Sequence, residues 1–191
     1  MTESWSRLRH RSLDSVSTLH QLLADESTED RRLVLGYMET KRLLALAFEA
    51  YAVERYADTT VMEGVKRTVE ESMRSGYPYA PEKYLRVRGY GQVHSRLLAY
   101  LAPRIGTDVS AAELRMLTAD AVHTERRARE LRDLGLRLDA RESSGVDVYV
   151  LESAAPHAAT GAALQLARNI KEDRTLKKDH AAELLNQLGL E

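Results

Sequence analysis

Arginine side chains are concentrated in residues 123–132, which read His-Thr-Glu-Arg-Arg-Ala-Arg-Glu-Leu-Arg. The planar guanidinium of arginine can pair with the O6 and N7 edge of guanine, at about 1–3 kcal/mol of discrimination per base. If a helix here turns its apolar side chains toward a core, the polar ones face outward. The outward residues predicted to read bases are His123, Thr124, Arg126 and Arg127.

Further cations suit the phosphate backbone of DNA, where contacts hold register but carry no sequence information. The candidates are Arg86, Arg88, Arg96, Arg129, Arg132, Arg137 and Arg141. Residues 83–141 carry 12 basic and 7 acidic side chains, whereas both flanking segments are net acidic. A local positive potential is therefore expected although the formal net charge of the chain is only −1. The alternative is a solvated surface whose cations are offset by acids from elsewhere in the fold.

The elements around this arginine-rich segment follow a definite order. The apolar spacing of 93–101 predicts a helix, 106–109 a short extended piece, and a capping box at Ser110 opens a second helix. A third helix over 122–134 ends at Gly135. Residues 136–141 and 146–151 alternate apolar and polar side chains about a turn at Ser143-Ser144-Gly145, which predicts a β-hairpin.

Three helices followed by a two-stranded ribbon is the order of a winged helix-turn-helix, in which the third helix enters the DNA major groove. Residues 107–151 resemble bacterial winged-helix domains. They are similar in particular to the winged-helix module that accompanies HNH-type and restriction nucleases, in which an arginine-rich helix precedes a hairpin. This resemblance implies DNA binding through helix 122–134, with Arg137, Arg141 and the turn Ser143, Ser144 and Gly145 as wing contacts. The chain has no HNH motif, so nuclease activity does not follow from it.

The remainder of the chain predicts helices, so the expected fold is mainly α. The expected organisation is an N-terminal helical domain over 1–75, a connector over 76–91, a winged helix over 92–152 and C-terminal helices over 153–191. The apolar segment 33–57 suits the central helix of an N-terminal bundle. The leucine-bearing helix 175–188, with part of that bundle, is the predicted interface of a homodimer. Tyrosines and arginines interleave in the connector, which predicts either base stacking or a proline-pinned loop tucked onto the helices, and we favour the loop.

The residue types and motifs of the chain give little support to an enzymatic function. The chain has no cysteine, which excludes thiolate metal sites and cysteine nucleophiles. The six histidines are scattered, and no nucleotide-binding glycine motif is present. A restriction-type metal site could use the carboxylates of Asp139, Asp147 and Glu152. Such sites carry a Glu-x-Lys motif, but Ser153 and Ala154 follow Glu152, so the lysine is missing. We therefore expect no catalytic residue, no metal and no cofactor.

The sequence thus predicts a cytoplasmic, nucleoid-associated, non-enzymatic protein that binds double-stranded DNA. Transcriptional regulation or target recognition in a restriction or phage-defence system are the expected roles. One alternative is a scaffold whose winged helix docks a protein partner. A second alternative is a metal-dependent nuclease. No stretch is apolar enough to span a membrane, so no membrane partner is expected.

Overall fold

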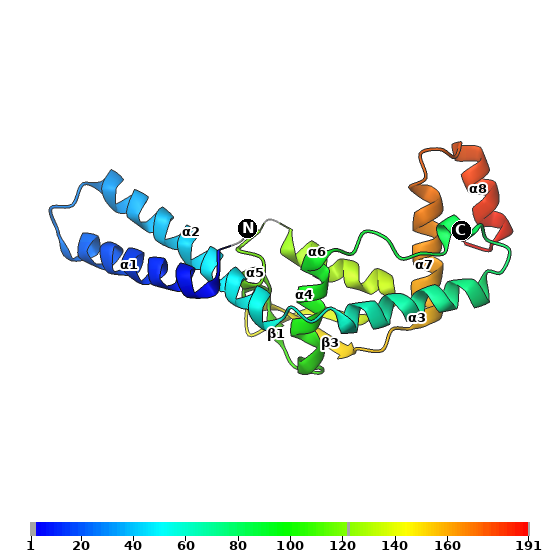
Figure 1. Cartoon of the computed structure of the whole chain (residues 1–191), viewed down its shortest axis with the longest axis horizontal. Helices are drawn as coiled ribbons and strands as arrows, with labels where there is room; N and C mark the ends of the chain where they lie inside the picture. Colours follow the sequence, from blue (N-terminus) through cyan, green and yellow to red (C-terminus); the bar gives the residue numbers. More distant parts are fainter. Residues whose placement is uncertain (1–2, 122, 191) are drawn as a thin grey trace. The chain divides into compact units, whose positions relative to one another are not determined.

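A computed structural model describes residues 3–121 and 123–190. The described residues form eight α-helices and one three-stranded antiparallel sheet, which confirms the predicted mainly α fold. The helices are α1 (Trp5–Ala24), α2 (Asp30–Arg55), α3 (Thr60–Gly76), α4 (Gln92–Leu101), α5 (Ala111–Met116), α6 (Thr124–Glu130), α7 (Ala158–Lys171) and α8 (Lys178–Gln187). The strands are β1 (Val109–Ser110), β2 (Arg137–Ser143) and β3 (Val146–Ser153) (Figure 1). No helix of these residues is long and apolar enough to cross a membrane.

The chain divides into two compact units. The first unit consists of Met1–Ala57 and Ala112–Thr124, and the second of Asp58–Ala111 and Glu125–Glu191. This division differs from the boundaries expected from the sequence. Helix α3 was expected in the N-terminal helical domain, yet it packs on α7 within the second unit.

In the first unit, α1 and α2 form an antiparallel helical hairpin, drawn in blue in Figure 1. Leu8 of α1 is buried with Ala47 and Ala50 of α2. The small side chains let the helices approach closely, because a Cβ added at Gly36 would lie 2.6 Å from Leu22 Cδ1. Helix α2 therefore packs its inner face on α1 and is not the central helix of a larger bundle, because much of its other face is exposed.

In the second unit, α3, α7, α8 and the connector share one apolar core. The leucines of α8 contribute to this core, with Leu185 buried and Leu184 and Leu188 packed against it. The apolar stripe of the C-terminal helix is thus used inside the unit, so it is not an open dimer interface as the sequence had suggested.

The connector lies against α7, as the favoured interpretation of its tyrosines predicted. Tyr84 and Tyr90 are buried, whereas Tyr79 is fully exposed. Asn169 of α7 donates its side-chain amide to the carbonyl oxygens of Tyr84 and Arg86, both at 2.7 Å. These bonds fix an irregular backbone that has few partners of its own.

The small sheet confirms the predicted hairpin. Strands β2 and β3 pair in register from Leu138 opposite Leu151 to Ser143 opposite Val146, and β1 adds to the other edge of β3. The two turn residues Ser144 and Gly145 both have positive φ angles, 54° and 77°. A two-residue turn of this kind matches the twist of the flanking strands.

Candidate nucleic-acid interface

Helix α6 and the 3₁₀ turn Leu131–Leu134 that continues it carry the arginine-rich segment. Ala128, Leu131 and Leu134 are fully buried, as predicted, and Gly135 ends the segment with φ 78°. A Cβ on Gly135 would meet the His157 carbonyl oxygen at 2.4 Å, so only glycine fits this stop. The predicted helix over 122–134 is α-helical only from Thr124 to Glu130, and its first residue, Val122, lies outside the described residues.

Glu130 pairs with both arginines that were predicted to read bases. Its carboxylate lies 3.1 Å from Arg126 Nε and 3.4 Å from Arg127 Nη1. The side chains of Arg126 and Arg127 nevertheless remain 71% and 51% exposed. Ion pairs this exposed contribute little stability, about 0–1 kcal/mol, so a phosphate or a base edge can replace the carboxylate.

A buried network holds Glu130 in place. His94 of α4 is buried, and its Nε2 lies 2.9 Å from Glu130 Oε2. The Tyr90 ring packs edge-on against His94, and its hydroxyl donates to the Glu130 carbonyl oxygen at 3.3 Å while accepting from Gln165 Nε2 at 2.8 Å. His94 of α4 therefore holds the carboxylate that faces the arginines, and Tyr90 of the connector, bonded to α7, holds the Glu130 backbone.

The environment shifts the pKa values of this network. Burial lowers the pKa of His94 below its usual value and outweighs the opposing effect of Glu130. Burial alone would raise the pKa of Glu130, but the hydrogen bond with His94 and the charge of Arg127 lower it overall. Burial raises the pKa of Tyr90 to about 12. At neutral pH the network therefore holds a neutral imidazole and an ionised carboxylate.

Two of the predicted contact residues are buried in the structure. Thr124 is buried, and its hydroxyl donates to the Ala121 carbonyl oxygen at 2.8 Å and lies 2.6 Å from the Thr118 hydroxyl. Arg96 is buried within α4. Neither side chain lies at the surface where DNA could bind. The helical spacing that placed Thr124 outward fails because Thr124 begins the helix and its hydroxyl bonds to the preceding turn.

The other residues predicted around α6 lie at the surface. Arg129 and Arg132 are exposed, although Arg132 Nε also donates to the Leu138 carbonyl oxygen. His123 is exposed and precedes α6 with φ 75°. Arg126, Arg127 and Arg129 are thus the exposed arginines of one short helix.

The β-ribbon carries cations and anions in mixture. Arg137 lies 3.9 Å from Glu152, and Arg141 lies 2.7 Å from Asp108. Near the turn, Glu142 stands directly opposite Asp147. Like charges at paired positions repel one another and would also repel phosphate. Ser143 and Ser144 at this turn therefore lie in an acidic setting.

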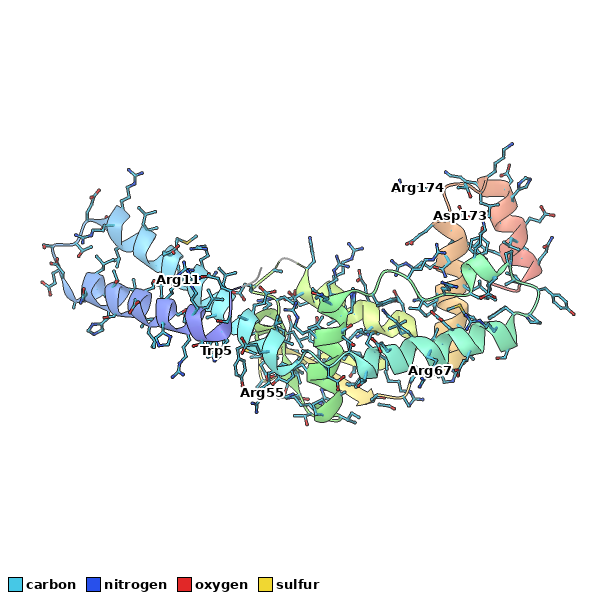
Figure 2. All side chains as sticks on the ribbon, viewed as in Figure 1. Trp5, Arg11, Arg55, Arg67, Asp173 and Arg174 are labelled. Atoms are coloured by element: carbon cyan, nitrogen blue, oxygen red, sulfur yellow. The ribbon has the colours of Figure 1, made fainter. Side chains whose placement is uncertain are left out.

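Arg86 and Arg88 belong to a second basic group, on the connector. Arg88 donates to the Lys83 carbonyl oxygen at 2.8 Å. The anchor of this region is Asp173, which follows α7 (Figure 2) and accepts from Lys83 Nζ and the Tyr84 hydroxyl, both at 2.7 Å. These bonds and a further one from Thr175 hold the pKa of Asp173 well below its usual range. The contacts of the connector thus lie at the carboxyl end of α7.

The acidic residues considered for a nuclease do not assemble a metal site. Among residues 3–121 and 123–190, no group of three or more histidine or carboxylate side chains is placed to hold a metal ion. Asp139 pairs across the ribbon with Val150, and Asp147 with Glu142. The geometry therefore offers no shared position for a cation between these carboxylates.

Sequence reasoning missed Glu130, His94 and Asp173 as organising residues. Glu130 follows Arg126 by four positions and Arg127 by three, which is a detectable signal for ion pairs on a helix. No local pattern links Asp173 to Lys83, because 90 positions separate them.

Comparison with known proteins adds one finding. A family model described as the KpnI N-terminal domain matches residues 94–152, which run from α4 into β3. No curated protein and no solved structure matches the chain. The segment that is similar to the KpnI N-terminal domain therefore contains α6, β2 and all of β3 except Ser153.

Proposed function

We propose that this chain binds double-stranded DNA and acts as a target-recognition component of a restriction system. The match of residues 94–152 to the KpnI N-terminal domain carries the proposal, because the name of that domain connects it with restriction enzymes. The matched segment also contains the three exposed arginines of α6. Both observations concern the same 59 residues.

In this proposal, α4, α5, α6 and the β-ribbon correspond, in their order along the chain, to the elements of a winged helix. The order of the elements along the chain and the sheet order β1-β3-β2 support it. Helix α6 is the recognition element, and Arg126 and Arg127 leave Glu130 to pair with base edges. Arg129 and Arg132 bind phosphate.

The wing has a secondary role in the proposed complex. Arg137 and Arg141 each face a carboxylate, and the turn is flanked by Glu142 and Asp147. The contacts of the wing with phosphate are therefore confined to Arg137 and Arg141. We assign no cleavage to this chain, so a supercoiled plasmid incubated with it and Mg²⁺ stays intact.

A salt titration of DNA binding tests the proposal. Affinity for a random duplex is measured by fluorescence anisotropy from low to high salt. Each phosphate contact contributes about −0.9 to the slope of log K against log salt, so the four arginines assigned to phosphate, Arg129, Arg132, Arg137 and Arg141, predict a slope of about −3.6. A protein-docking module would leave the duplex unbound at every salt concentration.

A matched pair of triple variants tests whether DNA affinity depends on the α6 arginines or only on the total charge of the chain. Arg126→Ala/Arg127→Ala/Arg129→Ala removes three exposed cations from α6, whereas Lys171→Ala/Lys177→Ala/Lys178→Ala removes three exposed cations from the same unit. The first variant should lose on the order of 100-fold in affinity, and the second no more than about threefold. Equal losses for both variants would mean that binding follows total charge and not the α6 face.

A further inference from the structure

A buried histidine of α4 and an exposed arginine of α6 meet the same carboxylate oxygen. His94 Nε2 lies 2.9 Å from Glu130 Oε2, and Arg127 Nη1 lies 3.4 Å from that oxygen. Arg126 Nε donates to the other carboxylate oxygen, Oε1, at 3.1 Å. Asp133, on the turn that follows α6, adds a further negative charge that acts on Glu130. One carboxylate thus joins a buried imidazole to two exposed guanidinium groups.

The surroundings of His94 decide where the positive charge lies in the free chain. The Tyr90 ring packs edge-on against the imidazole, and Lys66 of α3 donates to the Tyr90 carbonyl oxygen at 2.8 Å. Burial and the positive charges of Arg127 and Lys66 lower the pKa of His94, and they outweigh Glu130, which raises it. The free chain at neutral pH therefore keeps its cations on the arginines, above a neutral imidazole.

DNA binding at α6 would disturb this balance, so the inference that follows rests on the proposed function. Guanidinium groups that turn toward base edges leave the Glu130 carboxylate without its two exposed partners. The Glu130 side chain is only 21% exposed, so water replaces these partners only in part. A partly buried carboxylate without a cation is costly. His94 stays in contact with the same carboxylate, and as an imidazolium it supplies the missing positive charge.

We propose that DNA binding at α6 is coupled to the uptake of a proton by His94, which replaces Arg127 as the cation on Glu130 Oε2. Neutral His94 already donates from Nε2 to Glu130, so the proton passes from solvent to Nδ1. Arg127 and an imidazolium at one oxygen repel each other, and the departure of Arg127 removes this repulsion. The coupling is reciprocal, so protonation of His94 also favours the release of Arg127 toward DNA.

A pH titration of the free chain tests this exchange without DNA. The nitrogen NMR signals of the His94 imidazole, assigned by their loss in His94→Asn, report the protonation of each ring nitrogen. Arg127→Ala should raise the pH at which His94 is half protonated, because it removes the competing cation. Arg129→Ala removes an arginine of the same helix that is not paired with Glu130 in the part of the chain that the structure describes. It should titrate as the wild-type chain does, and the same titration in all three chains would overturn the inference.

The complex with duplex DNA tests the coupling itself. Affinity should rise by up to about tenfold per pH unit as pH falls through the range in which His94 is neutral in the free chain and charged in the complex. His94→Asn should flatten this dependence, whereas His180→Asn, at an exposed histidine of α8, should retain it. In the wild-type chain at neutral pH, both ring nitrogens of His94 should carry a proton in the complex, and only Nε2 in the free chain.

The same signals separate His94 from the other histidine near α6. His123 is exposed at the proposed DNA surface, so its own protonation would also make affinity depend on pH. Protonation of His123 alone would leave His94 neutral in the complex, which would overturn this inference and leave DNA binding standing. A chain that binds duplex DNA at no pH would overturn the proposed function and the coupling together.

Discussion

Two basic regions of this protein look alike in sequence but differ in how their cations are held. On α6, Arg126 and Arg127 are exposed and share one carboxylate, Glu130, at 3.1 and 3.4 Å. On the connector, Lys83 bonds at 2.7 Å to Asp173, which also binds Tyr84. The first arrangement can exchange its carboxylate for a ligand, whereas the second joins two segments of the fold. A cation is available for binding only when its removal from its own partner leaves the fold intact.

The largest expected effect is on base preference at α6. On the best site selected from a random duplex library, Arg126→Ala and Arg127→Ala should each cost about 1–3 kcal/mol of binding free energy and relax base preference. Arg132→Ala should weaken all sequences alike, because that side chain is assigned to phosphate. Competition binding against single-base variants of the site measures the difference. Equal losses on every sequence for all three variants would remove the base-reading roles.

Next in size is the effect of removing the connector anchor. Asp173→Asn should lower the thermal unfolding midpoint while leaving DNA affinity unchanged, because Lys83 and Tyr84 lose an ionised acceptor. Since folding lowers the pKa of Asp173, its stabilising effect is full above the unfolded value of 3.8 and is lost as pH falls through the lowered pKa. Melting curves over acidic pH, compared with Glu172→Gln on the exposed neighbour, measure the contribution. If Asp173→Asn lost DNA binding while its thermal unfolding midpoint stayed unchanged, the connector cations would act in binding and not in stability, contrary to the comparison above.

A smaller effect is expected from the buried histidine behind α6. Folding lowers the pKa of His94, so the unfolded chain takes up a proton first as pH falls. The free energy of unfolding should therefore decrease as pH falls below about 6.5 and level off below the folded pKa. His94→Asn should flatten this part of the curve, with the exposed His180→Asn as the control. Denaturant titrations at several pH values measure this dependence. If His94 were not responsible, the free energy of unfolding of the His94→Asn chain would change with pH as it does in the wild-type chain.

The smallest effect should come from the carboxylate that the α6 arginines share. Glu130→Gln removes a competitor for Arg126 and Arg127, so DNA affinity should rise by a few fold at low salt, consistent with the small contribution of exposed ion pairs. Glu125→Gln changes the same charge on the same helix and serves as the control. A fall in affinity for Glu130→Gln alone would show that this carboxylate positions the arginines instead of competing for them.

Much of the candidate site could be predicted from local patterns. The buried face of α6, the stop at Gly135 and the hairpin with its turn at Ser144-Gly145 all follow from spacing and turn chemistry. The solvent exposure of individual polar side chains could not be predicted from these local patterns. Arg96 and Thr124 share the residue types of a binding surface, but their burial depends on what packs around them.

The helices, the ribbon and the segment that holds the arginines can be predicted from local sequence, because they depend on residues a few positions apart. Which apolar faces are covered depends on how the elements pack together. The tertiary structure placed Leu184 and Leu185 of α8 in the core of the second unit and left Val34, Leu35 and Met38 of α2 exposed. The two helices have similar apolar spacing, and burial depends on neighbours brought together by the fold, which periodicity cannot specify.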